Sequence, residues 1–372
     1  MNVFQYGHAH AEQWQDAADD CLNQLGTFDP QANLGFLYVT DLLSKELPDI
    51  LAYFKRQTDV EQWVGTVGIG ISSQGIEYFD QPAIAVMLGE FPENSFRVFT
   101  NIEDELKEFA RTHQAWCDTK QAMFAVVHGD PQHDKISNLV YQLSEQLDEG
   151  FLVGGLTSSR HEYSQIANSV TQGKISGALF SSVVPVAVRL TQGCSVIGPR
   201  HQITECESNI IVKIDERPAL DVFFEDIGED LADNLNKIAG YIFAALPIQG
   251  SDTGDYLVRN LVGIDLKHKL VAIAEPVKPG TTIMFTKRDA DSAYADLVKM
   301  LTRLKNTLKE PPKGGLYYSC LGRGENLFGS DSQELKTIQR VLGDFPLVGF
   351  FANGEIYHQR LYGYTGVLTL FL

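Results

Sequence analysis

The feature that most constrains the fold is an order of elements that occurs three times. Each copy predicts a strand, a helix, a second strand and a third strand. The predicted bounds are 34–41, 47–56, 63–71 and 83–89 in copy one, 123–130, 135–147, 151–156 and 175–181 in copy two, and 315–320, 332–342, 347–351 and 366–371 in copy three. The second strand of each copy begins with a Val-Gly pair: Val64-Gly65, Val153-Gly154 and Val348-Gly349. This recurrence indicates internal duplication, although the simple alternation of an α/β chain produces similar units.

Units of this kind predict an α/β fold of the α+β type, with mixed sheets and helices on the outer faces. We expect two related halves, which could pack as a helix-sheet-sheet-helix sandwich. An amphipathic helix is predicted for residues 10–24, within an N-terminal helical segment of residues 1–28. The clearest internal boundary lies near residues 193–218, which predicts domains of residues 29–217 and 218–372.

The charge of the chain limits its partners. The chain contains 48 acidic and 30 basic residues, which gives a formal net charge of −18. Such an excess repels phosphate, so neither nucleic acid nor an anionic membrane is an expected partner. The five cysteines are odd in number and form no C-x-x-C pair, which fits a reducing cytoplasm. The N-terminus lacks the basic start and apolar core of a signal peptide. No metal or cofactor is predicted.

A late strand runs into a glycine-rich loop, and a second strand runs into a tight turn. The residues that form the candidate ligand site at these two strand ends are Cys320, Gly322, Arg323, Gly324, Asn353, Gly354 and Glu355. Ligands usually bind at the carboxyl ends of strands in α/β sheets. The Arg323 guanidinium suits a carboxylate or phosphate, and Glu355 suits an ammonium group. A helix expected to start near residues 330–331 could favour an anion further.

Each of these features also has a simpler structural reading. The Gly-Arg-Gly loop could be a tight turn with a surface arginine, and Asn353-Gly354 could be a hairpin turn. Cys320 could be a nucleophile if a base and a lowered pKa activated it, but the sequence assigns it no base. A buried thiol at the end of a strand is the other interpretation of Cys320.

The C-terminal run resembles FIST-domain proteins. The resemblance rests on Cys-x-Gly-Arg-Gly-x-x-Leu-Phe-Gly at 320–329, Pro-Leu-x-Gly-Phe-Phe-Ala-Asn-Gly-Glu at 346–355, Tyr-x-Val-Arg-Asn at 256–260, Arg-Asp at 288–289 and the junction at 215–228. It covers most of residues 30–372 and gives the two predicted domains a FIST N-like and a FIST C-like character. Tyr357 and His358 stand where the family commonly has Gly-Pro.

The resemblance implies an intracellular sensory protein that binds a small polar ligand, such as an amino acid, in a cleft of the C-terminal half. Its signal would then pass to a separate signalling protein. Two alternatives remain open from the residues. One is a thiol-dependent hydrolase or a transferase that uses Cys320, and the other is a protein-binding scaffold.

Overall fold

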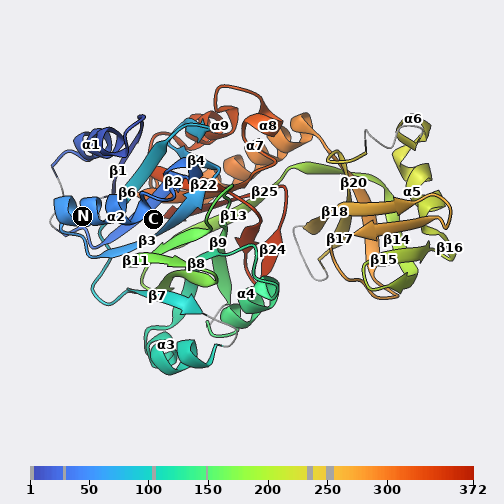
Figure 1. The fold of residues 1–372 in the computed structure, drawn as a ribbon, viewed down its shortest axis with the longest axis horizontal. Helices are drawn as coiled ribbons and strands as arrows, with labels where there is room; N and C mark the ends of the chain where they lie inside the picture. Colours follow the sequence, from blue (N-terminus) through green and yellow to red (C-terminus); the bar gives the residue numbers. More distant parts are fainter. Residues whose placement is uncertain (1–3, 28–30, 103–105, 148–149, 233–237, 249–254) are drawn as a thin grey trace. The chain divides into compact units, whose positions relative to one another are not determined.

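The computed structural model describes residues 4–27, 31–102, 106–147, 150–232, 238–248 and 255–372, and it divides into two compact units (Figure 1). Unit 1 comprises Met1–Gln192 and Tyr294–Leu372, and unit 2 comprises Gly193–Ala293. The predicted boundary between residues 217 and 218 therefore falls inside unit 2.

The elements of unit 1 follow the predicted copies closely. Copy one consists of β2 (Leu34–Thr40), α2 (Leu47–Thr58), β3 (Gln62–Gly68) and β6 (Ala83–Gly89). Copy two consists of β8 (Ala122–Gly129), α4 (Ile136–Ser144), β9 (Phe151–Leu156) and β12 (Ile175–Ser181). Copy three consists of β21 (Gly314–Cys320), α9 (Gln333–Leu342), β22 (Leu347–Ala352) and β25 (Thr365–Phe371). The predicted α+β class with mixed sheets is confirmed.

Unit 1 also contains elements that lie between or before the repeated ones. The helices are α1 (Trp14–Leu25), the 3-10 turn η1 (Asp41–Leu43), α3 (Lys107–Lys120), α8 (Glu325–Phe328) and most of α7 (Ala290–Thr307). Three strands precede the copies: β1 (Phe4–His10), β7 (Phe96–Ile102) and β13 (Val186–Gln192). Three hairpins complete the set: β4 (Gly70–Ser73) with β5 (Ile76–Phe79), β10 (Ser164–Ala167) with β11 (Ser169–Gln172), and β23 (Glu355–Tyr357) with β24 (Arg360–Tyr362).

These strands form three six-stranded sheets with the same topology. Their orders are β1-β6-β2-β3-β10-β11, β7-β12-β8-β9-β23-β24 and β13-β25-β21-β22-β4-β5. In each sheet the first and second strands of a copy are parallel, and the last strand runs antiparallel to the first. The internal repeat thus builds three equivalent sheets, where the sequence suggested two halves.

The hairpins join the copies in a closed cycle. The hairpin of copy one pairs with β22 of copy three, that of copy two pairs with β3 of copy one, and that of copy three pairs with β9 of copy two. Every sheet therefore depends on a hairpin from another copy. No copy of unit 1 can complete its sheet without a neighbour.

The recurring Val-Gly pair has a steric cause. Gly65, Gly154 and Gly349 occupy the same register position, opposite Leu37, Val127 and Tyr317 on the parallel first strands. A Cβ atom at any of the three would overlap the carbonyl oxygen of the residue opposite. Only glycine permits this close approach of two backbones.

The sheets share an inner core and have separate outer cores. The inner core takes residues from all three copies, including the valines of the Val-Gly pairs and Phe36, Val126 and Leu316. One outer core contains α1 and α2, another α3 and α4, and a third α7 and α9. Tyr38, His128 and Tyr318 take equivalent positions at the centre, where Tyr38 Oη lies 3.2 Å from His128 Nε2 and 2.9 Å from Tyr318 Oη.

The predicted N-terminal helix is present as α1, whose buried face includes Ala17, Ala18 and Cys21. The strand β1 before it was not predicted. Phe4 of β1 stacks on Phe371 of β25 with ring centroids 5.3 Å apart, which places the two ends of the described chain side by side in unit 1.

Unit 2 is a seven-stranded sheet with a helix packed on one face. Its strands are β14 (Cys194–Glu207), β15 (Ile210–Ile214), β16 (Arg217–Pro218), β17 (Ile242–Pro247), β18 (Tyr256–Asp265), β19 (Leu270–Ile273) and β20 (Thr282–Arg288). Helices α5 (Ala219–Ile227) and α6 (Glu229–Ala232) follow β16. Phe223 of α5 packs against Phe285 of β20 in the core of this unit.

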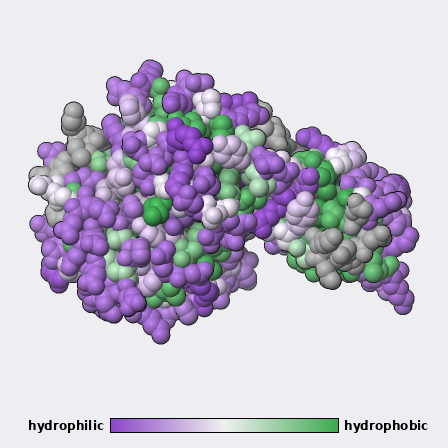
Figure 2. Space-filling model, turned by 90° about the horizontal axis from the view of Figure 1, so that it is seen from above, coloured by the Kyte–Doolittle hydropathy of each residue, from purple (hydrophilic) through white to green (hydrophobic). Residues whose placement is uncertain are grey.

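Figure 2 shows that hydrophilic residues cover most of one face of the molecule, with small apolar groups between them. Within the described part of the chain, no helix combines the length and the apolar character needed to cross a bilayer.

Candidate functional site

The predicted site residues come together at the carboxyl ends of β21 and β22. Cys320 is the last residue of β21 and lies opposite Ala352, the last residue of β22. The Leu321 amide donates to the Ala352 carbonyl at 3.1 Å, which holds the Gly-Arg-Gly loop against the Asn-Gly turn. We call this group of residues the strand-end site; its members are Cys320, Gly322, Arg323, Gly324, Asn353, Gly354 and Glu355. The parallel pairing of β21 and β22 brings the two segments together.

Arg323 is a buried residue with an internal partner. Its side chain is fully buried, and Nε and Nη2 lie 2.8 and 2.6 Å from Glu334 Oε1. The guanidinium also lies over the ring of Phe328, 5.0 Å from its centroid. Nη1 has no hydrogen-bond partner among the residues described. A surface arginine is therefore excluded, and one donor nitrogen is left for another group.

Glu334 organises the loop, and the sequence did not identify it. This fully buried carboxylate accepts hydrogen bonds from Tyr317 Oη at 2.6 Å and Ser319 Oγ at 3.1 Å as well as from Arg323. It also accepts the Gly324 amide at 2.9 Å. The available signal was its place in the first turn of α9, beside the core residue Leu335. Only the fold shows that this turn faces the loop.

Glu355 begins β23 and is also fully buried. Its Oε2 accepts the amide of Thr365 at 3.1 Å and the hydroxyl of the same residue at 2.7 Å. Burial raises the pKa of the Glu355 carboxyl to about 8, although Thr365 and the charge of Arg323 oppose this rise. Oε1 has no partner at full hydrogen-bond geometry among the described residues, and the neighbouring Cys320 thiol is the side chain placed to donate to this carboxyl. This carboxyl therefore carries a proton over much of the neutral range.

Cys320, Gly322 and Gly354 form the partly exposed edge of the strand-end site, and Gly324 is buried. Burial, followed by the nearby carboxyl of Glu355, raises the pKa of the Cys320 thiol above its usual range. Gly322 packs against the ring of Tyr364. A Cβ atom at position 322 would lie only 2.8 Å from Tyr364 Cε1. Gly324 has a φ of +55°, a backbone conformation that glycine adopts readily. Asn353 is exposed, and Gly354, with a φ of +123°, completes the turn.

A third acidic side chain approaches the loop from copy one. Glu77 lies on β5, in the hairpin that copy one adds to the sheet of copy three. A Cβ atom at Gly324 would be 3.0 Å from Glu77 Oε2. Burial and the neighbouring charge of Glu334 raise the pKa of Glu77 to about 8. No sequence pattern marks this residue, since the hairpin exchange is a property of the tertiary structure.

The combination of a thiol and a carboxyl at the strand-end site occurs in copy three and not in the other two copies. The strand register makes Thr40 and Asp130 the counterparts of Cys320, and Ile71 and Gln165 the counterparts of Glu355. Copies one and two thus fold without the combination of a thiol and a carboxyl at this place, so the presence of both in copy three indicates a specialised role there.

Two details around the site differ from the sequence expectations. The helix expected from residues 330–331 begins at Gln333, and the short helix α8 directly follows Gly324. Tyr357 and His358, which replace the family's usual Gly-Pro, lie where β23 turns into β24, and His358 has a φ of +55°. Tyr357 packs edge-on against Phe151 of β9.

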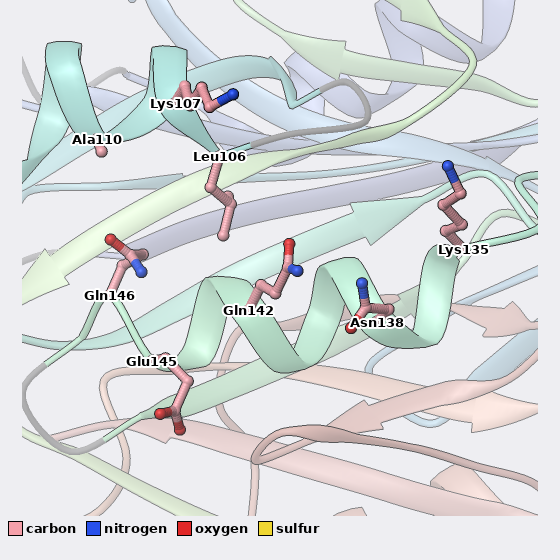
Figure 3. A pocket seen from close by; sticks show the side chains of 8 residues that line it. All are labelled: Leu106, Lys107, Ala110, Lys135, Asn138, Gln142, Glu145 and Gln146. Atoms are coloured by element: carbon pink, nitrogen blue, oxygen red, sulfur yellow. The ribbon is translucent and has the colours of Figure 1, made fainter.

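Two hollows of unit 1 lie outside the strand-end site, the second of them beside its Gly-Arg-Gly loop. A groove of about 700 Å³ runs between α3 and α4, as Figure 3 shows, with Leu106 and Ala110 on one side and Asn138 and Gln142 on the other. A second hollow of about 360 Å³ is lined by Glu77, Glu325 and residues at the start of α9. Neither is lined by Cys320, Arg323 or Glu355.

The fold and the site define a class of protein: a mixed α/β protein with three repeated units and one specialised strand-end site. A family model described as the FIST N domain matches residues 33–217, and one described as the FIST C domain matches residues 219–358. The chain belongs to the FIST family. FIST domains are sensory domains of signal transduction.

Proteins of two mycobacteria are similar to this chain. A protein of Mycobacterium tuberculosis is 28% identical over 344 residues, which cover 87% of each chain. A protein of Mycobacterium bovis is 26% identical over 344 residues, covering 87% of this chain and 86% of its own. Both are described as uncharacterized.

Proposed function

We propose that this protein is a cytoplasmic sensory protein that binds a small polar ligand, of amino-acid type, at the strand-end site. The observation that carries the proposal is a pair of buried groups without hydrogen-bond partners among the described residues. Glu355 Oε1 becomes an acceptor when the carboxyl ionises, and Arg323 Nη1 is a donor. Buried polar atoms are nearly always paired, so unpaired ones indicate a missing water or ligand.

An amino acid has the complementary chemistry. Its carboxylate accepts from a guanidinium, and its ammonium group donates to a carboxylate. The loop that carries Arg323 and the turn that precedes Glu355 are held together by the Leu321–Ala352 hydrogen bond, which supports placing both groups within reach of one small molecule. Cys320, Gly322 and Gly354 are only partly buried and Asn353 is exposed, so the proposed ligand would enter past these residues.

The hairpin exchange gives such a ligand a means of signalling. Arg323 follows β21 of copy three, whereas Glu355 lies on β23, which pairs with β9 of copy two. A ligand that contacts both residues links two sheets, so it favours the arrangement in which both contacts are made. The response then passes to a separate signalling protein. The cysteines among the described residues are all free, which agrees with a reducing cytoplasm.

A thermal-shift screen of amino acids and small carboxylates tests the proposal. A ligand present at 100 times its Kd stabilises the protein by about 2.7 kcal/mol, which is readily detected. Glu355→Gln cannot ionise to pair with an ammonium group but keeps an oxygen for Thr365, and we expect it to abolish the shift. The matched control is Glu325→Gln, which changes an exposed acid beside the same loop. A Glu355→Gln variant that responds like wild type would refute the assigned site.

The alternatives make different predictions. A thiol-dependent hydrolase needs Cys320 as a thiolate, and the raised pKa of this thiol opposes that state. A scaffold that binds only protein would show no thermal shift with any small molecule in the screen.

A further inference from the structure

Unit 2 contains a histidine whose two ring nitrogens both face carboxylates. His201 lies on β14 and is 9% exposed. Its Nδ1 is 2.6 Å from Asp215 Oδ2, and its Nε2 is 2.9 Å from Asp226 Oδ2. Asp215 follows β15, and Asp226 lies in the last turn of α5. The imidazole therefore joins two strands to the end of a helix.

The geometry requires a proton. A neutral imidazole has one N–H donor and one lone pair, whereas an imidazolium has two donors. Both carboxylates are within hydrogen-bond distance of a ring nitrogen, so only the protonated ring satisfies both as ionised acceptors. Loss of that proton would leave a lone pair facing a carboxylate oxygen at less than 3 Å.

A cation beside Asp226 stabilises the C-terminal end of α5. Asp226 is a negative charge near the C-terminus of α5, where the helix dipole disfavours anions. Its side chain is only 9% exposed, so water screens it little. Gly198, with a φ of +67°, leaves room for this carboxylate, since a Cβ atom there would overlap it. The strand β14 is thus shaped to receive Asp226 beside His201.

We propose that His201 is a proton-dependent latch that holds the last turn of α5 on β14 and releases it as the pH rises. The latch is a property of unit 2 and is independent of the ligand site proposed above.

The direction of the pH dependence follows from the groups that face the ring. Burial alone would lower the pKa of His201, but the hydrogen bonds and charges of Asp215 and Asp226 outweigh it and raise the pKa above 6.5. The other charged groups nearby are Glu225 on α5 and Arg217 on β16, which pair with each other. A raised pKa means that the latch is closed below the unfolded value of about 6.5 and opens as the pH passes the folded value.

Hydrogen exchange on the full chain tests the latch. Exchange of the α5 peptide, residues 219–227, would be measured at pH 6.5, 7.5 and 8.5 and corrected for the intrinsic rate at each pH. In wild type the opening of α5 should increase with pH, by at most about tenfold per unit for one proton. His201→Gln should open α5 more at pH 6.5 and remove most of the pH dependence.

The matched control is His268→Gln. His268 also lies in unit 2 and faces a carboxylate, Asp265 Oδ2, at 2.8 Å, but it is exposed and has a single acidic partner. This variant should behave like wild type. A His201→Gln variant that keeps the wild-type pH dependence overturns the proposal.

A measurement on wild type keeps the proposal testable if the variant fails to fold. The imidazole of His201 can be followed by NMR in histidine-labelled full-length protein. A titration midpoint above 6.5 supports the latch, and a midpoint at or below 6.5 refutes it.

Discussion

Glu334 provides the sharpest test of how the Gly-Arg-Gly loop is held. Glu334→Gln keeps the size of the side chain but removes the charge opposite the fully buried Arg323. It also places an amide where the carboxylate accepted from Tyr317, Ser319 and the Gly324 amide. Breaking a buried pair by changing one partner costs about 3–5 kcal/mol, because the remaining charge is left unpaired. We expect a loss of this size in the free energy of unfolding of unit 1.

Urea denaturation followed by circular dichroism measures this loss. The control is Asp331→Asn, which breaks an exposed ion pair with Lys336 at the start of α9 and should cost less than about 1 kcal/mol. The double variant Arg323→Met with Glu334→Gln removes both charges, keeps an amide oxygen as an acceptor and should be more stable than Glu334→Gln alone. If Glu334→Gln costs no more than Asp331→Asn, the buried pair does not hold the loop as described.

Three further predictions concern the repeat and the site. Gly349→Ala should destabilise unit 1 by about 1–3 kcal/mol or more in urea denaturation, because the new Cβ overlaps the Tyr317 carbonyl, whereas Gly263→Ala meets only an ordinary contact and should cost less. The pKa of the Glu355 carboxyl is near 4.3 in the unfolded chain and about 8 in the folded one, so the free energy of unfolding should fall as the pH rises between these values and then level off. Glu355→Gln should remove this part of the pH dependence in urea denaturation. Cys320 should react with iodoacetamide more slowly at pH 7.5 than free glutathione does, and a faster reaction would contradict its raised pKa.

The sequence predicted the elements of the three copies because each has a clear apolar pattern and the same order. The second, Val-Gly strand was recognisable because close backbone approach imposes the same glycine three times. Asp289, in the Arg-Asp segment of the resemblance, precedes α7, and its Oδ1 accepts the Ser292 amide at 3.0 Å.

The way in which the three copies pair with one another could not be predicted from local sequence patterns. A hairpin such as β4–β5 looks the same whether it pairs with its own copy or with another, so the cyclic exchange was not predicted. Glu77 and Glu334 were missed for the same reason, because their burial depends on contacts between distant segments. The two compact units likewise reflect tertiary contacts that the linear boundary near residue 217 does not mark.

The central claim is that an ammonium-bearing ligand binds the Glu355 carboxyl. Because burial keeps this group protonated up to about pH 8, binding of a cation at neutral pH must release a proton. Titration calorimetry of an amino acid from the screen, at pH 7 in two buffers with different heats of ionisation, measures that proton directly. Release of a proton by wild type and by Glu325→Gln, together with its loss in Glu355→Gln, is the predicted result. Binding without proton release, or release that persists in Glu355→Gln, would contradict the assignment.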